Sequence, residues 1–337
     1  MKITFFDVKP WEKTLLDAAL TGHELAYFTE PLQEVKDLST AVDADIISVF
    51  VSSKANKDNL PQFKNLKMIA ARSTGFDNID LSYCQEHKIE VAYVPSYGEN
   101  TVAEHAFALI LNLSRNIHKA YLRTIKEDYS LDGLKGFDLQ GKTLGVIGAG
   151  RIGLHAIRIG RGFGMDVLAF DCCPNEFLSQ TMAFSYTKDL NELLNKSDVI
   201  TVHVPNLPET KHLINKDNIK QIKKGAILIN TARGEVIETE ALIEALDQEI
   251  LKGVGLDVLE NEALVLEEHR LADHQPSSDQ LAELAKDHVL LRRDNVIYTP
   301  HMAFYSQEAI DRITHCTIEN LVAFAAGKKI NLVKTNQ

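Results

Sequence analysis

The sequence predicts an α/β protein made of two doubly wound domains, one of them inserted into the other. Short apolar runs alternate with amphipathic segments over residues 1–100, and the same alternation resumes between Lys142 and Pro300. Alternation of this kind is typical of parallel sheets covered by helices. A glycine-rich turn at 148–153 opens the second stretch rather than the first. The segment after His301 is too short to form a domain, so we expect it to return to the first hundred residues.

The first hundred residues contain five predicted strands and one clear predicted helix. The strands are KITFFDV, ELAYF, ADIISVFV, KMIAA and IEVAYV, and the helix is WEKTLLDAAL. Asn100 then predicts the N-cap of one long helix, VAEHAFALILNLSRNIHKAYLRTI. The apolar face of this helix is unusually broad, so we expect burial on more than one side, with a subunit interface as one option.

Six further runs predict a parallel sheet in the second domain: TLGVI, DVLAF, DVITVHV, GAILINT, GVGLDV and NVIYT. A polar segment at 263–293 interrupts the pattern, and we expect a solvated loop and one helix there. A last helical segment, EAIDRITHCTIENLVAFAAG, ends at a glycine. We predict no metal site, because the spacing of the acids and histidines in the polar segment matches no ligand motif: His269, Asp273, His274, Asp287 and His288.

Composition excludes several classes of protein. The chain has 337 residues and a net charge of −11, which argues against a nucleic-acid partner because such a partner needs a basic surface. No apolar stretch approaches the roughly 20 residues that cross a bilayer, and the start, MKITFFDVKPWEK, lacks the apolar region of a signal peptide. The four cysteines form no C-x-x-C and no metal-ligand spacing, which indicates a reducing cytoplasm.

The string LGVIGAGRIG at 144–153 has the spacing of a dinucleotide-binding turn. Gly148 permits the tight turn from strand to helix, and Gly150 lets a pyrophosphate approach the backbone. Gly153 lets the new helix pack closely on the sheet. Three glycines alone are weak evidence, but an apolar strand precedes them and a segment with helical periodicity follows. The alternative is a simple glycine turn without a ligand.

Asp171 is the expected acidic partner of this turn. It lies 18 residues beyond Gly153, at the end of the apolar run DVLAF. Its carboxylate can accept hydrogen bonds from ribose hydroxyls and would repel a 2′-phosphate, which favours NAD over NADP. Cys172 and Cys173 follow, at a point where an NADP site more often places an arginine.

Three further strand ends carry polar side chains suited to reducing a 2-oxo acid. Arg233 follows GAILINT, Asp257 and Glu262 follow GVGL, and His301 follows NVIYTP. Ligands of open α/β sheets bind beyond the carboxyl ends of the strands, so we expect these side chains to lie at one rim. Arginine offers a bidentate fork for a carboxylate, histidine a proton near neutral pH, and a neighbouring acid orients the imidazole. Singly, each residue also fits an ordinary surface position.

The first domain is expected to supply the remaining substrate contacts. In RSTGFDNID the N–H groups near Thr74 and Gly75 are candidates for an anion-binding turn. Tyr97 lies in VPSYGEN, where the chain crosses between domains. An ordinary turn at Gly75 is the alternative.

These sequences resemble the D-2-hydroxyacid dehydrogenase family, and most closely its D-lactate dehydrogenase branch. The similarity extends over nearly the whole chain: RSTGFDNID, VPSYGENTVAEH, LGVIGAGRIG, VHVP, INTARG, GLDVLENE and TPHMAFY. It implies a discontinuous substrate (catalytic) domain, flavodoxin-like or Rossmann-like, formed by 1–100 and 301–337. It further implies an inserted Rossmann domain for NAD at 101–300, and a homodimer formed largely through the NAD domains.

The resemblance also implies roles for individual residues. His301 would be the acid/base, Glu262 its carboxylate partner and Arg233 the substrate-binding arginine. Substrate contacts would come from Thr74, Gly75, Tyr97, Arg233, His301 and Phe304. Cofactor contacts would come from Gly148, Gly150, Arg151, Ile152, Gly153, Asp171, His203, Val204, Pro205, Thr231, Ala232, Arg233, Asp257 and His301.

The implied reaction is the reduction of pyruvate by NADH to D-lactate. Glu262 argues against formate dehydrogenases of the superfamily, which pair the histidine with glutamine because their reaction transfers no proton. Thr74 stands where lactate-specific members often have valine, and the 263–293 segment occurs in only some of them. Two alternatives stay open: a dehydrogenase for another 2-oxo acid, such as phenylpyruvate, 2-oxoisocaproate, glyoxylate or hydroxypyruvate, or an NAD-sensing regulatory protein of the same fold.

Overall fold

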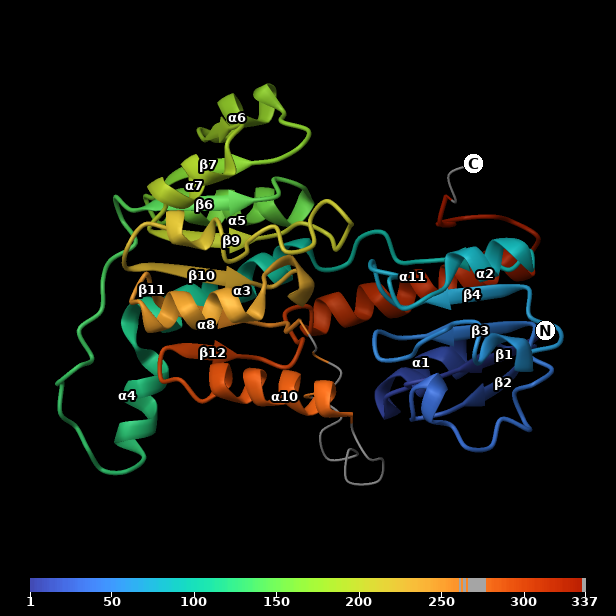
Figure 1. Ribbon diagram of the computed structural model, residues 1–337. Coiled ribbons are helices and arrows are strands. Elements are labelled where there is room, and N and C mark those ends of the chain that lie inside the picture. The colour runs from blue at the N-terminus through green and yellow to red at the C-terminus, as the bar shows by residue number, and fades with distance from the viewer. Residues whose placement is uncertain (261, 263–264, 266–276, 335–337) are drawn as a thin grey trace. The chain divides into compact units, whose positions relative to one another are not determined.

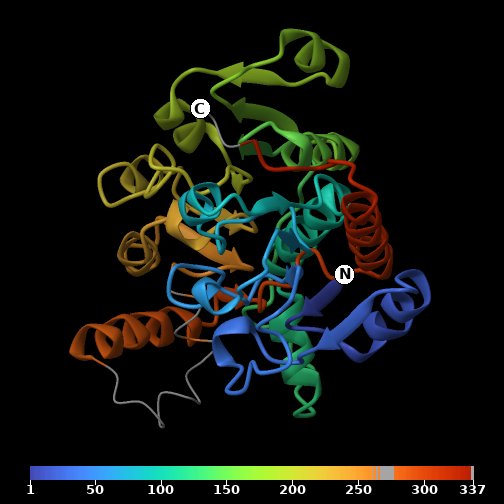
Figure 2. The same ribbon diagram turned by 90° about the vertical axis from the view of Figure 1, so that its right-hand side faces the viewer.

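The computed structural model describes residues 1–260, 262, 265 and 277–334, and it divides into two compact units. Unit 1 contains Met1–Gly98 and Ser306–Gln337, and unit 2 contains Glu99–Tyr305. Figure 1 and Figure 2 show the elements of each unit in two views. The first stretch of the chain and its last helix therefore lie in one compact unit.

Unit 1 is built on a five-stranded sheet in which every described pairing is parallel. Strands β3 and β4 are buried along their whole length, which explains why their sequences, IISV and MIAA, are apolar without alternation. The expected strands and helix of the first hundred residues are thus confirmed. Across the sheet the strands are β2 (Glu24–Tyr27), β1 (Lys2–Phe5), β3 (Ile46–Val49), β4 (Met68–Ala71) and β5 (Glu90–Ala92). The helices are α1 (Pro10–Ala19), α2 (Leu81–Glu86) and α11 (Gln307–Ala325).

The C-terminal segment returns to this sheet, as predicted. Helix α11 packs against α1 and β4. Asn320 Nδ2 donates a hydrogen bond to the carbonyl of Tyr93 (3.0 Å), and Leu332 forms an antiparallel bridge with Ala92. Since Leu321 is fully buried in the same core as Ala92, the last helix is part of the hydrophobic core of unit 1.

Unit 2 contains a seven-stranded sheet, and its described strand pairs are also parallel. The chain runs from β6 outward through β7 to β8, then crosses to β9 and continues outward on the other side. The direction of winding therefore reverses between β6 and β9, where doubly wound sheets bind ligands. Across the sheet the strands are β12 (Val296–Tyr298), β11 (Leu251–Leu256), β10 (Ala226–Asn230), β9 (Val199–Val202), β6 (Thr143–Ile147), β7 (Asp166–Phe170) and β8 (Ser185–Thr187).

Helices cover both faces of this sheet. Helices α3 and α5 pack together over one apolar cluster, and α7, α8 and α10 contribute to the second. Glycines on β11 allow α3 to lie close to the sheet: a Cβ at Gly255 would stand 3.0 Å from Leu109 Cβ. The helices of unit 2 are α3 (Glu99–Arg115), α4 (Ile117–Thr124), α5 (Arg151–Gly162), α6 (Glu176–Met182), α7 (Leu190–Lys196), α8 (Thr239–Asp247) and α10 (Ser278–Leu291).

The prediction of one long helix beginning after an Asn100 cap was wrong in two respects. The helix starts at Glu99, and Asn100 lies in its first turn, where it bonds Glu104 Oε1 (3.1 Å). The helix also breaks at Asn116, which has a φ of +51°. Asparagine tolerates this left-handed conformation, and its amide donates to the carbonyls of the 134–135 loop. The expected broad burial holds for α3 alone, because α4 has no buried residue.

Two smaller expectations also meet the structure. The sheet has seven strands rather than about six, because the edge strand Ser185–Thr187 is too short and polar to form an apolar run. The helix expected within 263–293 is α10, whereas His269, Asp273 and His274 lie outside the described residues. Among the described helices none is long and apolar enough to cross a membrane.

Candidate active site

The strand ends predicted from the sequence lie along one edge of the seven-stranded sheet. In spatial order the carboxyl ends of β12, β11 and β10 lead to His301, Asp257 and Arg233. The carboxyl ends of β9, β6 and β7 lead to 203–205, Gly148 and Asp171. One part of the edge thus carries the glycine turn and its acid, and the adjoining part carries the arginine and histidine.

Each glycine of the turn has the environment that its expected role requires. Gly148 has a φ of +93°, and a Cβ there would stand 2.8 Å from Val204 Cγ1. A Cβ at Gly153 would stand 1.9 Å from the carbonyl oxygen of Gly148, so only glycine lets α5 begin this close to the strand. A Cβ at Gly150 would meet no protein atom within 4 Å. The space over Gly150, at the start of α5, is therefore open to a ligand.

Asp171 closes the far side of this turn. Its Oδ2 accepts a hydrogen bond from the N–H of Ala149 (2.7 Å), and its Oδ1 accepts one from the N–H of Cys173 (2.8 Å). These bonds hold the carboxylate at the rim, where the residue is half-buried. The thiols of Cys172 and Cys173 are both exposed next to it.

Two polar atoms after β9 and β10 have no hydrogen-bond partner among the residues that the structure describes. Thr231 is buried, and its Oγ1 has no hydrogen-bond partner among the described residues. His203 bonds Thr201 through Nε2 (3.0 Å), whereas its Nδ1 is likewise unpartnered within the described part of the chain. Loss of solvation lowers the pKa of His203 to about 4, so its imidazole is neutral at physiological pH. Buried polar groups normally find a partner, so these two atoms are suited to meet a polar ligand.

Arg233 is positioned by a tightly folded loop. Asn230, which is buried at the end of β10, accepts from the N–H of Ala232 (3.0 Å) and donates to the carbonyl of Arg233 (2.8 Å). A Cβ at Gly234 would stand 1.9 Å from the carbonyl oxygen of Leu259. The arginine loop therefore lies directly against the loop that leads to Glu262.

The carboxylate and imidazole that the sequence predicted to pair do so. His301 Nδ1 and Glu262 Oε2 are 2.9 Å apart, with side chains 30% and 19% exposed. Glu262 Oε1 is buried without a hydrogen-bond partner among the described residues. A carboxylate at Nδ1 fixes the orientation of the ring, so Nε2 is the nitrogen that can face a reactant.

Asp257 holds the turn that carries His301. Its side chain is 1% exposed and accepts hydrogen bonds from the N–H groups of Met302 (3.0 Å) and Ala303 (2.8 Å) and from Thr299 Oγ1 (2.5 Å). His301 itself has a φ of +50°, a left-handed conformation that is rare outside glycine. The carboxylate of Asp257 is thus engaged with backbone and hydroxyl donors of the turn.

In unit 1, the turn at Thr74 and Gly75 is ordered by its own side chains. Thr74 Oγ1 donates to the carbonyl of Val94 (2.7 Å), and Ser73 Oγ donates to the carbonyl of Gly75 (2.6 Å). The N–H groups of Thr74 and Gly75 have no acceptor among the described residues. This leaves two donors available on an exposed turn.

The sequence did not single out the residues that support the site. His105, on α3, lies 2.9 Å from Thr299 Oγ1 and 3.5 Å from Asp257 Oδ1. Glu260 accepts from the N–H of Thr239 (3.0 Å) and pairs with His212, which anchors the loop before Glu262. A signal existed for His105, since it lies four residues from buried Thr101 and four from buried Leu109 on one helical row.

The glycine turn, Asp171 and the unpartnered atoms of Thr231 and His203 together fit a dinucleotide. Open space over the start of a helix suits a pyrophosphate, and a carboxylate at the end of the second strand suits ribose hydroxyls. Residues 107–303 match the family model described as D-isomer specific 2-hydroxyacid dehydrogenase, NAD binding domain.

Relatives match over the whole length of the chain. The D-lactate dehydrogenase of Escherichia coli is 37% identical over 332 residues, which cover 97% of this chain and 98% of the relative. A crystal structure of D-lactate dehydrogenase from Aquifex aeolicus, complexed with NAD and lactic acid, is 37% identical, with a TM-score of 0.89 and coverage of 99% and 100%. A D-2-hydroxyisocaproate dehydrogenase structure is 31% identical, with a TM-score of 0.82 and coverage of 99% of each chain. The chain belongs to the D-isomer specific 2-hydroxyacid dehydrogenase family and is an NAD-dependent oxidoreductase.

Proposed function

We propose that this protein is a D-lactate dehydrogenase, which reduces pyruvate with NADH to D-lactate. The observation that carries the proposal is the Glu262–His301 pair, 2.9 Å apart, on the sheet edge that also bears Arg233. The two D-lactate dehydrogenases described above, each 37% identical, support lactate within the family. The handedness of the product rests on the family.

In the proposed reaction the chain's residues bind the oxo acid and deliver one proton. NADH, when bound, supplies a hydride to the carbonyl carbon. The Arg233 guanidinium binds the substrate carboxylate and polarises the carbonyl oxygen. His301 uses Nδ1 for Glu262, so its Nε2 donates the proton to the oxygen as the C=O bond becomes C–OH. Glu262 stabilises the imidazolium before transfer and keeps the ring oriented afterwards.

The remaining contacts are proposed on the family resemblance together with their environments. For the substrate these are Thr74 and Gly75, whose N–H groups suit a carboxylate, and the side chains of Tyr97 and Phe304. For NAD the proposed contacts are Gly148, Gly150, Arg151, Ile152, Gly153, Asp171, His203, Val204, Pro205, Thr231, Ala232, Arg233, Asp257 and His301. In this assignment unit 1 is the substrate domain and unit 2 the NAD domain.

The proposal is tested by NADH oxidation with a panel of 2-oxo acids, followed by chiral analysis of the product. We expect pyruvate to have the highest kcat/KM and to give D-lactate. His301→Gln should lower kcat by about 10³-fold, because no group then donates the proton, while NADH affinity stays within about twofold. NADH binding is measured by fluorescence.

The outcomes separate the alternatives. If kcat/KM is higher with phenylpyruvate, 2-oxoisocaproate, glyoxylate or hydroxypyruvate than with pyruvate, that oxo acid is the better candidate substrate. NADH binding without turnover of any oxo acid would favour an NAD-sensing regulatory protein. Unchanged turnover in the His301→Gln variant would remove the proposed mechanism.

We also propose that the chain forms a homodimer through unit 2. Helix α4 and the following loop project from the rest of that unit (Figure 1). They carry six large apolar side chains that are each between 53% and 83% exposed. Such a group of exposed apolar side chains is typical of an interaction surface. A molar mass near 37.6 kDa by light scattering would contradict a dimer. The exposed side chains are Ile117, Tyr121, Leu122, Ile125, Tyr129 and Leu131.

The proposed location is the cytoplasm. Its support is the state of the four cysteines, which are all free thiols, two of them exposed at Cys172 and Cys173. Cell fractionation with a tagged chain tests this, and recovery outside the cytoplasmic fraction would contradict it.

A further inference from the structure

A histidine outside the proposed catalytic set reaches the turn that carries His301. His105 lies on the second turn of α3, with its side chain 17% exposed. Its Nε2 is 2.9 Å from Thr299 Oγ1 and 3.5 Å from Asp257 Oδ1. The contact joins residues 194 positions apart in the chain, so α3 and the 299–303 turn are linked through polar atoms.

The hydrogen-bonding capacity of each group determines the direction of these bonds. The carboxylate of Asp257 only accepts, and it takes hydrogens from Met302 N, Ala303 N and Thr299 Oγ1. The Thr299 hydroxyl has a single hydrogen, which goes to Asp257 at 2.5 Å. Thr299 Oγ1 must therefore accept from His105, which requires a hydrogen on His105 Nε2.

The turn needs such support because of its backbone. The residues after β12 pass through His301 at a φ of +50°, and a non-glycine residue persists there only when its surroundings hold it. The backbone N–H of His301 donates to the carbonyls of Asp257 and Thr299, both at 2.9 Å. Each of these hydrogen bonds of the turn has Asp257 or Thr299 as a partner. The side chain of His105 contacts both residues.

We propose that His105 is a positioning residue: by donating to Thr299 and adjoining Asp257, it holds the turn in the conformation that orients the His301 imidazole. The inference rests on the proposed role of His301 as proton donor. In this proposal His105 acts through Thr299 and Asp257 and not by contact with a reactant. Removal of its donor should loosen the turn and leave the NAD-binding turn at Gly148 unchanged.

The test compares two substitutions of nearly equal size. His105→Leu removes the donor, whereas the amide of His105→Gln can place a donor near the position of Nε2. We expect His105→Leu to lower kcat with pyruvate by about tenfold, the effect of one lost hydrogen bond of ordinary strength. NADH affinity by fluorescence should stay within about twofold. His105→Gln should restore kcat to within about threefold of wild type.

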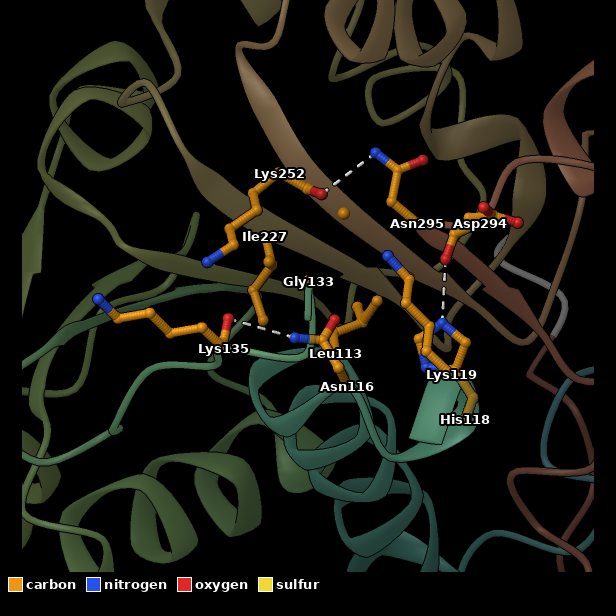
Figure 3. A pocket seen from close by; sticks show the side chains of 11 residues that line it. Leu113, Asn116, His118, Lys119, Gly133, Lys135, Ile227, Lys252, Asp294 and Asn295 are labelled. Atoms are coloured by element: carbon orange, nitrogen blue, oxygen red, sulfur yellow. Dashed lines mark hydrogen bonds between the residues drawn. The ribbon is translucent and has the colours of Figure 1, made fainter. Parts of the chain in front are cut away.

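His118 supplies the matched control. It is another half-buried histidine of unit 2, and its Nε2 bonds the carbonyl of Asp294 (3.0 Å) while Nδ1 faces Asn112 Oδ1 (3.1 Å). Figure 3 shows it in a pocket near the amino ends of the strands, beside the starts of β10 and β11. The proposed catalytic residues follow the carboxyl ends of the strands. His118→Leu should thus lose a side-chain hydrogen bond without changing kcat.

A second readout does not depend on turnover. Hydrogen exchange of the 299–305 peptide should be faster in His105→Leu than in wild type, and unchanged in His118→Leu. A wild-type kcat in His105→Leu, equal losses in the Gln and Leu variants, or unchanged exchange would each overturn the inference. Wild-type protein that reduces no 2-oxo acid would instead refute the proposed function, and the exchange rates would still decide whether His105 holds the turn.

Discussion

Two pairs of ionisable side chains, one in each unit, show how burial separates a structural ion pair from a pair that we propose to be reactive. In unit 1 Arg72 Nε is 3.2 Å from Glu12 Oε1, and the two side chains are 1% and 6% exposed. In unit 2 His301 Nδ1 is 2.9 Å from Glu262 Oε2, with 30% and 19% exposed. The separations are similar, whereas access to solvent differs several-fold.

The Arg72–Glu12 pair is also held by further hydrogen bonds inside unit 1. Arg72 also donates to the carbonyls of Phe6 (2.8 Å) and Asp7 (2.9 Å) and to Ser48 Oγ (3.2 Å), and Glu12 accepts from the N–H of Lys9 (2.8 Å). Burial lowers the pKa of the Arg72 guanidinium, while the carboxylates of Glu12 and Asp7 oppose this shift. The arginine thus joins the residues after β1 to β3 and α1 and stabilises the fold of unit 1.

The largest expected effect comes from breaking the buried pair. Arg72→Met should lower the free energy of unfolding by about 3–5 kcal/mol, because the carboxylate of Glu12 stays buried without its cation. Denaturant-induced unfolding measures the loss. Lys67→Met is the control, since its pair with Asp45 is exposed (Lys67 Nζ to Oδ1, 2.6 Å) and should contribute about 0–1 kcal/mol. Equal losses in the two variants would contradict the assignment.

Substitution in the partly exposed Glu262–His301 pair should change activity more than stability. Glu262→Gln keeps a hydrogen-bond acceptor for His301 Nδ1 but removes the charge that stabilises the imidazolium, so kcat should fall on the order of 10²-fold. The free energy of unfolding should change by less than about 1 kcal/mol, because the pair is partly exposed. If Glu262→Gln lost as much stability as Arg72→Met and kept a normal kcat, the Glu262–His301 pair would be structural and not reactive.

This contrast also explains what the sequence could predict. Apolar runs identified both sheets because their central strands are buried on both faces, as in AILIN of β10. The positions of the strand ends predicted Arg233, Glu262 and His301 as site residues, since parallel strands bring their carboxyl ends to one edge. Edge strand β8 was not predicted because its three residues, SYT, form no apolar run. The helix break at Asn116 was not predicted because it depends on hydrogen bonds to a loop about 18 residues away.

The supporting residues were harder to predict, because their partners are far away in sequence. His105 and Thr299 are 194 positions apart, and Arg72 meets Phe6 across 66. Nothing in RSTGFDNID distinguishes a buried Arg72 from a surface arginine, since its burial follows from where β1 and α1 pack. Local motifs predict groups that meet ligands at strand ends, whereas long-range hydrogen bonds need the fold.

A third buried ionisable group, Asp287 on α10, sharpens the comparison because it forms no ion pair with a described residue. Its side chain is 1% exposed, and Oδ2 has no hydrogen-bond partner among the described residues. Burial, followed by the charges of Glu283 and Glu260, raises the pKa of Asp287 to about 6, and His288 and Lys286 only partly oppose this. Where Arg72 is buried as an ion beside an acid, Asp287 keeps its proton up to about pH 6 in the fold.

The smallest predicted effect follows from this proton and depends on pH. Below about pH 4 the carboxyl is neutral in both the folded and the unfolded chain, so its contribution to stability is fully present. As pH rises through about 6 that contribution is lost, because the unfolded chain ionises first and the fold resists ionisation. Asp287→Asn, which stays neutral, should therefore stabilise the protein by on the order of 2 kcal/mol at pH 8 and by almost nothing at pH 4. Thermal unfolding across this range measures the difference, with exposed Asp217→Asn as the control. A pH-independent effect at Asp287 would show that folding does not raise the pKa of its carboxyl.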